Sequence, residues 1–267
     1  MKKVGFGVLL FLYAYTSFAQ VKILYQAHAH NDYEHKKPLF EALSLGFISI
    51  EADIHLVDGQ LLVSHNKPKL GEAKTLRESY LEPLRKRILA NQGKVYPNTS
   101  IPLYLMIDIK TDAQSTYQVL KEQLTEYQEI ITYWKHGQEN KGAVLVFLSG
   151  NRPVDTVIND TLRFVALDGR LEDLDRHYPN QIMPVISENY TKIFKWKGSG
   201  QMPQEEVEKL KNLTTKTNQQ GKKLRFWASP ENENVWKTLM ENNVGLIGTD
   251  QLERLSRFLH TYRSAID

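Results

Sequence analysis

Residues 103–110, Leu103-Tyr104-Leu105-Met106-Ile107-Asp108-Ile109-Lys110, are a run of apolar side chains that ends with a carboxylate and an amine. A strand that is apolar at nearly every position is typical of a sheet covered on both faces, as in proteins built from parallel strands and helices. The same character returns in Val144-Leu145-Val146-Phe147-Leu148. These two runs predict central parallel strands.

Eight short apolar runs alternate with amphipathic or charged stretches. They cover residues 22–29, 47–54, 103–109, 143–148, 163–167, 182–186, 223–228 and 244–247. Helices are predicted between and after them, over residues 37–45, 76–91, 113–126, 154–159, 205–219, 234–242 and 252–264. Eight strands with helical crossovers favour an α/β fold, a single (β/α)8 barrel, over an open sheet.

One feature interrupts this alternation. Asp58-Gly59 separates Ile54-His55-Leu56 from Leu61-Leu62-Val63, and Asp-Gly between apolar segments is a strong signal for a β-hairpin. We therefore expect a small hairpin after the second strand. Residues 137–142, 151–153 and 197–200 are predicted to be loops, and no domain boundary is expected.

The first residues, MKKVGFGVLLFLYAYTSFAQ, have two lysines, an apolar core and a small-residue ending. This pattern predicts a signal peptide over residues 1–19, cleaved before Gln20. The apolar core is shorter than the about 20 residues of a membrane-spanning helix. The remaining domain, residues 20–267, is expected to be exported to a periplasm or secreted, without a stable membrane anchor.

The composition excludes several classes of function. The chain has no cysteine, so it has no disulfide, no thiolate nucleophile and no lipoprotein attachment site. The net charge of +3 falls to +1 (3 − 2) when Lys2 and Lys3 leave with the signal peptide. A net charge this small does not indicate a nucleic-acid-binding protein.

Glu51 and Asp53 lie two residues apart in a predicted strand and therefore point to the same side. Adjacent carboxylates repel each other, and a divalent metal with a preference for oxygen ligands, Mg²⁺ or Ca²⁺, would stabilise them; the alternative is a solvated edge. Asp108 ends the third strand, where catalytic groups of barrels collect, and is a third candidate ligand. Lys110 shares its side and can form a salt bridge or bind a phosphate oxygen.

Two histidines are expected near these acids. His30 follows the first strand within Ala27-His28-Ala29-His30-Asn31-Asp32-Tyr33, and His65 closes the hairpin fourteen positions (65 − 51) after Glu51. Imidazoles there can transfer protons near neutral pH. His28 points the same way as His30, so it is either the alternative catalytic histidine or a polar residue beneath the site.

Together, His30-Asn31-Asp32-Tyr33, Glu51-x-Asp53, His65 and Asp108-x-Lys110 resemble the phosphoinositide-phospholipase-C-like phosphodiesterase superfamily. It includes glycerophosphodiester phosphodiesterases and sphingomyelinases D, which are distorted TIM barrels. Residues 225–228 and 245–250 resemble its last two strands. Residues 28–33 and 38–46 resemble most closely the branch of the altered-inheritance-of-mitochondria protein six.

The resemblance implies a metal-dependent phosphoric diester hydrolase of lipid metabolism, with one divalent metal. The implied catalytic residues are His30, His65 and Lys110, and the implied metal ligands are Glu51, Asp53, Asp108 and Asn31. Candidate substrate-binding residues are Trp227, Arg170 and His28. Trp227 and Arg170 are expected near the carboxyl ends of the strands, where a core position for Trp227 and turn formation or helix capping for Arg170 are the alternatives. The substrate would be a glycerophosphodiester or a phospholipid head group, and attack by a neighbouring substrate hydroxyl would give a cyclic phosphate. Asn31-Asp32 replaces the Arg-Gly of glycerophosphodiesterases, and their Pro-Glu-Asn-Thr segment is missing.

Two other functions are compatible with these residues. Paired carboxylates on a barrel also occur in glycoside hydrolases, although those acids flank the scissile bond about 5–10 Å apart and usually come from different strands. A barrel that binds phospholipid head groups or carbohydrates without catalysis is the third possibility. Such a barrel would be expected to lack a catalytic position, whereas both histidines and all three acids are present.

Overall fold

The computed structural model describes residues 21–264. The predicted signal peptide, residues 1–19, lies outside the described residues. Within the described residues, no helix is both long enough and apolar enough to cross a membrane.

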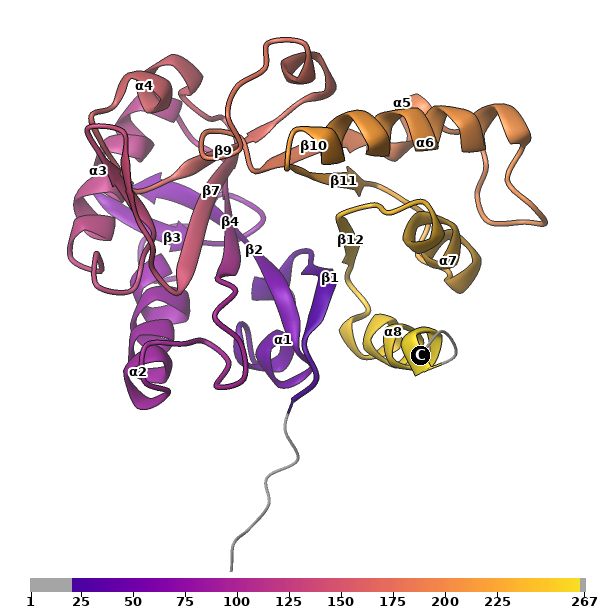
Figure 1. Ribbon diagram of the computed structural model, residues 1–267. Helices are drawn as coiled ribbons and strands as arrows, with labels where there is room; N and C mark the ends of the chain where they lie inside the picture. The colour runs from indigo at the N-terminus through magenta and orange to yellow at the C-terminus, as the bar shows by residue number, and fades with distance from the viewer. Residues whose placement is uncertain (1–20, 265–267) are drawn as a thin grey trace, which may run out of the picture.

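Eight parallel strands form a closed barrel, as predicted (Figure 1). Each strand pairs with the next in the chain, and the last returns to the first through the pairing of Ala27 with Ile247. The strands are β1 (Leu24–Ala29), β2 (Phe47–Val57), β4 (Leu103–Ile109), β7 (Val144–Gly150), β9 (Ala166–Gly169), β10 (Val185–Asn189), β11 (Lys223–Trp227) and β12 (Leu246–Thr249).

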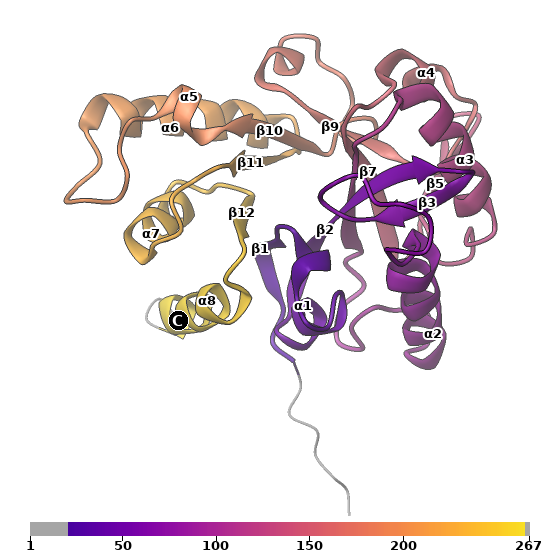
Figure 2. The ribbon, with the colours of Figure 1, turned by 180° about the vertical axis from the view of Figure 1, so that it is seen from behind.

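The helices lie outside the barrel (Figures 1 and 2). They are α1 (Phe40–Ser44), α2 (Glu82–Ala90), α3 (Ala113–Thr125), α4 (Val154–Asn159), α5 (Tyr190–Ile193), α6 (Gln204–Gln219), α7 (Glu233–Glu241) and α8 (Leu252–Ser264). A π-helical segment, Arg77–Leu81, precedes α2, and short 3-10 helices cover Asp32–Glu34 and Leu171–Leu174. Only the 3-10 helix Leu171–Leu174 lies between β9 and β10, so the barrel departs there from a regular alternation of strands and α-helices.

The core explains why β4 is apolar almost throughout. Leu105 and Ile107 are fully buried on the outer face of the strand, under the helices, while Met106 is buried inside the barrel. The parallel register pairs Asp53 of β2 with Asp108 of β4. Neighbouring inward side chains of these strands therefore meet at the carboxyl end of the barrel.

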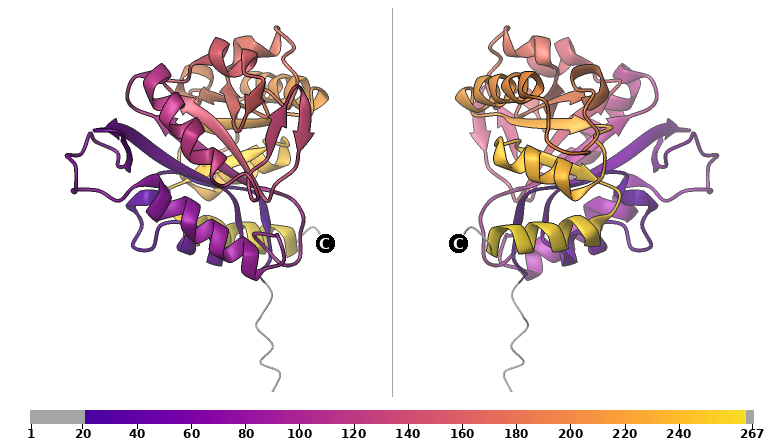
Figure 3. Two further views of the ribbon diagram at one scale, coloured as in Figure 1. Left: turned by 90° about the vertical axis from the view of Figure 1, so that its left-hand side faces the viewer. Right: turned by 90° about the vertical axis from the view of Figure 1, so that its right-hand side faces the viewer.

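The predicted hairpin is present. β2 continues beyond the barrel and pairs with β3 (Gln60–Val63), and Asp58 and Gly59 have the positive φ angles that a tight hairpin turn requires. The hairpin projects from one side of the barrel (Figure 3). After it, the Ser64 amide donates to the Asp53 carbonyl at 3.2 Å, so the next residue, His65, lies beside the carboxyl end of β2.

The sequence prediction missed a second, three-stranded sheet. It consists of β5 (Tyr133–Lys135), β6 (Gln138–Asn140) and β8 (Leu162–Arg163). The prediction of a loop over residues 137–142 is therefore wrong for residues 138–140. These residues are polar and exposed, and the turn relies on a non-glycine residue, His136, at φ 49°, so neither hydrophobicity nor turn composition identified the strand.

Candidate active site

His30 follows the last residue of β1 and lies beside the end of β12. Its amide donates to the Thr249 carbonyl at 3.1 Å, and its Nδ1 lies 2.7 Å from Asp250 Oδ1. Burial lowers the pKa of His30, but the hydrogen bond to Asp250 and the charge of Glu51 outweigh it and raise that pKa above its ordinary value. Nε2 is then the ring nitrogen left to act on a substrate.

Three carboxylates from β2 and β4 form one cluster. Glu51, Asp53 and Asp108 each place an oxygen within 4.8 Å of the others. Glu51 and Asp53 are buried, and Asp108 is half-buried at the pocket. Burial, together with the charges of Asp53 and Glu51, raises the pKa of Asp108 to about 6 although Lys110 opposes this effect. At Asp108, therefore, the Lys110 amine does not offset the combined effect of burial and the two neighbouring acids.

Lys110 bridges two of these acids. Its Nζ lies 3.0 Å from Asp53 Oδ2 and 3.1 Å from Asp108 Oδ1. Burial disfavours the charged amine, but Asp108 and Asp53 outweigh this effect and raise the pKa of Lys110 above its ordinary value. The amine is therefore charged at neutral pH, and it remains partly exposed to the pocket.

The donor set fits a divalent cation. Within residues 21–264 the buried Oδ1 of Asp53 has no hydrogen-bond partner, so an oxygen of the cluster lacks the interaction that its burial requires. Carboxylate oxygens are the ligands that Mg²⁺ and Ca²⁺ prefer. Asn31 lies beside the cluster, and its Oδ1 accepts a hydrogen bond from the Tyr33 hydroxyl at 2.9 Å.

Tyr33 connects the cluster to the second histidine. Its hydroxyl lies 2.7 Å from Asp53 Oδ2 and 3.2 Å from His65 Nδ1. His65 Nδ1 also lies 3.4 Å from Asp53 Oδ2, and the side chain of His65 is exposed. The hairpin thus brings an imidazole to the rim of the carboxylate cluster, as predicted. The role of Tyr33 was not predicted, although the residue is part of the motif that begins at His28.

Beneath the cluster, Glu51 is held by two donors. His28 Nε2 lies 3.0 Å and Arg225 Nη2 2.9 Å from Glu51 Oε2. Burial disfavours the ionised carboxyl, but Arg225 and His28 outweigh this effect and lower the pKa of Glu51 to about 2. Burial and the charge of Arg225 lower the pKa of His28 to about 4. At neutral pH the carboxylate is charged and His28 is neutral.

One pocket at the carboxyl end of the barrel brings together nine of the ten predicted site residues: His30, Asn31, Glu51, Asp53, His65, Asp108, Lys110, Arg170 and Trp227. His28 is the exception. It is fully buried and both ring nitrogens have partners, Ser49 and Glu51, so the structure leaves it no surface on which to bind a substrate. This corrects its predicted role as a substrate-binding residue.

The rest of the pocket lining comes from the ends of β7, β9 and β11. Ser149 and Arg170 both donate to Asp168 Oδ2 at 2.9 Å, and Asp168 is fully buried. The Trp227 side chain is 40% exposed, so a substrate can reach its ring. The sequence assigned no role to Ser149 or Arg225, because their contacts with the site depend on which strands are neighbours in the barrel.

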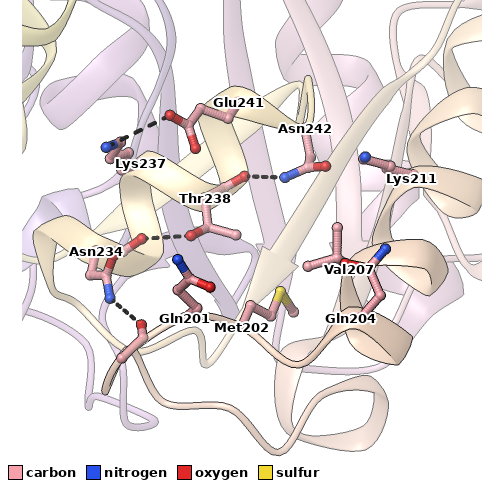
Figure 4. Close-up of a pocket in the computed structure, with 11 residues that line it drawn as sticks. Gln201, Met202, Gln204, Val207, Lys211, Asn234, Lys237, Thr238, Glu241 and Asn242 are labelled. Carbon is pink, nitrogen blue, oxygen red and sulfur yellow. Dashed lines mark hydrogen bonds and ion pairs between the residues drawn. The ribbon is translucent and has the colours of Figure 1, made fainter.

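A second hollow lies outside the barrel between α6 and α7 (Figure 4). Its charged side chains are Lys211, Lys237 and Glu241, and Lys237 pairs with Glu241 at 3.8 Å. No histidine and no group of acids lines it among the described residues. This hollow therefore offers none of the candidate acid–base groups that line the barrel pocket.

Comparison with protein families assigns residues 16–168 to the AIM6-like phosphodiesterase domain. The matched span contains both pocket histidines, the three carboxylates and Lys110. It ends before Arg225, Trp227 and Asp250, which complete the pocket region from the last strands.

Curated relatives of the chain include fungal proteins. The altered inheritance of mitochondria protein 6 of Lachancea thermotolerans is 29% identical, over 88% of this chain and 66% of its own length. Its homologue in Arthroderma benhamiae is 27% identical, over 84% of this chain and 81% of its own length. The chain thus spans somewhat less than two thirds of the Lachancea protein and about four fifths of the Arthroderma protein.

Solved structures share the fold. A glycerophosphodiester phosphodiesterase from Parabacteroides distasonis matches with a TM-score of 0.53 at 13% identity, covering 89% of this chain and 98% of its own. A phosphodiesterase from Oleispira antarctica, solved with the product sn-glycerol-3-phosphate, matches with a TM-score of 0.53 at 12% identity. The match covers 88% of this chain and 96% of the Oleispira chain. These likenesses confirm the predicted distorted TIM barrel.

Proposed function

The chain belongs to the AIM6-like phosphodiesterase family, and from this premise we propose that it is a metal-dependent phosphoric diester hydrolase in which His30 and His65 transfer protons. The observation that carries the proposal is the cluster of Glu51, Asp53 and Asp108 in one pocket with both imidazoles. Phosphodiesters need charge neutralisation at phosphorus and proton transfer on both sides of it, and this pocket contains groups for each.

The three carboxylates would hold one divalent metal, with the amide oxygen of Asn31 as a fourth ligand. A site of oxygen donors favours Mg²⁺ or Ca²⁺ over softer transition metals. When bound, the metal would neutralise the non-bridging phosphate oxygens and supply several kcal/mol of stabilisation to the transition state.

Residues of the chain itself would carry out the proton transfers and help to stabilise the charge on the phosphate. One imidazole takes a proton from the attacking water or substrate hydroxyl, and the other donates a proton to the leaving oxygen, each contributing about 10²–10⁴-fold. The partly exposed amine of Lys110 binds a phosphate oxygen and stabilises its developing charge. If a hydroxyl of the substrate attacks, the product is a cyclic phosphate; if water attacks, it is a phosphomonoester.

A small phosphodiester, either a glycerophosphodiester or a phospholipid head group, is the proposed substrate. The same pocket is lined by the ring of Trp227, which offers an apolar contact, and by the cationic side chain of Arg170. The product found in the Oleispira phosphodiesterase, sn-glycerol-3-phosphate, supports a substrate of this size. The charge of the chain gives no reason to expect nucleic acid.

We further propose that the protein is exported after cleavage before Gln20. The motif in residues 1–19 supports this proposal. N-terminal sequencing of protein recovered from the periplasm or the medium tests it. A mature chain that begins at Gln20 is expected, whereas full-length protein retained in the cell would contradict export.

An assay on two substrate classes tests the proposed function. Nitrophenol release from bis-p-nitrophenyl phosphate, abolished by EDTA and restored by Mg²⁺ or Ca²⁺, is expected, with none from aryl glycosides. The oxygens of the acid cluster lie within 4.8 Å of one another, and Glu51 and Asp53 share one strand, which favours a shared cation over glycosidase acids flanking a bond. Release from the glycosides alone would contradict the proposal, and no release from any phosphodiester would favour a binding barrel.

A further inference from the structure

A chain of four buried side chains lies under the proposed metal site and has no part in the proton transfers. Ser49 Oγ lies 2.7 Å from His28 Nδ1, His28 Nε2 lies 3.0 Å from Glu51 Oε2, and Arg225 Nη2 lies 2.9 Å from the same oxygen. None of the four residues is more than 4% exposed. These four hydrogen-bonded side chains link β2, β1 and β11, so they span the place where the first and last strands of the barrel meet.

The hydrogen bonds have one consistent direction. The ionised Glu51 carboxylate can only accept, so His28 Nε2 carries the proton and donates it. A neutral ring then accepts at Nδ1, and the Ser49 hydroxyl is the donor there. The ring is therefore held at both nitrogens, and it presents a donor to Glu51 Oε2 from a fixed direction.

We infer that His28 is a positioning residue: it fixes the rotation of the Glu51 carboxylate so that Oε1 is presented to the cation shared with Asp53 and Asp108. Both donors bind Oε2, which leaves the other oxygen for the pocket that Glu51 lines. Groups that orient a metal ligand from outside typically account for 10- to 100-fold in metal affinity. The inference rests on the metal site of the proposed function.

His28 gives a cleaner test than Arg225. Replacing the guanidinium would remove a buried positive charge as well as a donor, and these two changes act on cation affinity in opposite directions. Replacing the His28 imidazole by an amide introduces no charge and changes which hydrogen bonds reach Glu51. His28→Gln and His28→Asn form a matched pair, because the glutamine amide reaches the position of Nε2, whereas the shorter asparagine amide reaches only that of Nδ1.

The experiment is a calorimetric titration of Mn²⁺ into the EDTA-stripped full chain. Wild type is expected to bind one Mn²⁺, His28→Gln to bind it within about threefold of wild type, and His28→Asn about 10- to 100-fold more weakly. Ser187→Ala is the control: Ser187 is a buried, inward-facing residue of β10 whose hydroxyl has no hydrogen-bond partner in residues 21–264. Its Mn²⁺ affinity is expected to equal that of wild type.

Thermal unfolding of each variant shows whether it is folded. If His28→Asn does not fold, Ser49→Ala replaces it, because loss of the hydroxyl that fixes the ring should still weaken Mn²⁺ binding several-fold. Equal Mn²⁺ affinities of His28→Gln and His28→Asn, or no binding by wild type, would overturn the inference. His28-dependent Mn²⁺ binding by a chain that hydrolyses no phosphodiester would overturn the proposed function and leave the positioning role intact.

Discussion

His30 Nδ1 lies 2.7 Å from Asp250 Oδ1, although the two residues are separated by 220 positions in the chain. They come together because β1 and β12 are neighbours in the closed barrel. A carboxylate on Nδ1 fixes the orientation and the tautomer of the ring, which leaves Nε2 for the substrate. The first and last strands of the barrel thus jointly position the imidazole that we propose to be catalytic.

Asp250→Asn should therefore lower kcat about 10- to 100-fold while KM changes little, because the substrate does not need the carboxylate for binding. The hydrogen bond to Asp250 raises the pKa of His30, so the ionisation of His30, followed by NMR, should move to lower pH in the variant. An unchanged kcat would show that the pair has no catalytic role. Gln251→Asn, at an exposed neighbouring position, is the control.

Lys110→Met should lower kcat/KM for phosphodiesters about 10²- to 10³-fold, since it removes a charged donor placed for a phosphate oxygen. The change also leaves Asp53 and Asp108 without the amine that bridges them. Steady-state kinetics measure the effect, and Lys86→Met, at an exposed position of α2, is expected to behave like wild type. Equal kinetics for both variants would restrict Lys110 to a structural salt bridge.

Gly150→Ala should disrupt the acid cluster. Gly150 has a φ of 65°, and a Cβ there would clash with the Asp108 carboxylate and with the Ile109 carbonyl at 2.5 Å. We expect loss of measurable activity and a Mn²⁺ affinity reduced at least tenfold, as the ligand is displaced. Gly59→Ala, at φ 78° with nothing within 4 Å, has the same backbone strain without the clash, and it should retain activity. Normal Mn²⁺ affinity in Gly150→Ala would contradict the placement of Asp108.

Asp32 should make stability depend on pH. It is fully buried, and it accepts hydrogen bonds from the Leu39 amide at 2.6 Å and the Tyr80 hydroxyl at 2.8 Å. Burial outweighs these bonds and raises its pKa to about 6. Between the ordinary pKa near 3.8 and this value the folded state binds the extra proton, so the free energy of unfolding falls as pH rises through this window.

The contribution of Asp32 to this fall is about 2–3 kcal/mol. Asp32→Asn cannot titrate, so the difference in unfolding free energy between variant and wild type should shift in favour of the variant by that amount between pH 4 and about pH 6.5. Urea denaturation at several pH values measures it. A difference that is independent of pH would contradict the raised pKa.

The sequence was sufficient for the barrel because its strands are short and continuously apolar, while its helices are amphipathic. β4 and β7 were predicted almost to the residue, since their side chains are buried on both faces. Strand ends were predicted less accurately. β10 runs from Val185 to Asn189, whereas the sequence predicted a strand over residues 182–186. In this segment the polar Glu188 and Asn189 continue the strand instead of ending it.

The acid cluster was also predictable, because the two-residue period of a strand places Glu51 and Asp53 together without further information. The residues that form hydrogen bonds and ion pairs with the site were not predictable. Arg225 and Asp250 reach the site only through closure of the barrel, and Tyr33 reaches it through a short helical turn after β1. The local sequence pattern does not predict contacts between residues that are far apart in the chain.

The most direct test of the account is the rate of nitrophenol release from bis-p-nitrophenyl phosphate by the metal-loaded wild type and by the His30→Ala, His65→Ala double variant. Two imidazoles that each contribute about 10²–10⁴-fold predict that the double variant is at least 10⁴-fold slower while its Mn²⁺ affinity and thermal unfolding stay close to those of wild type. A folded, metal-binding double variant that retains the wild-type rate would contradict the account.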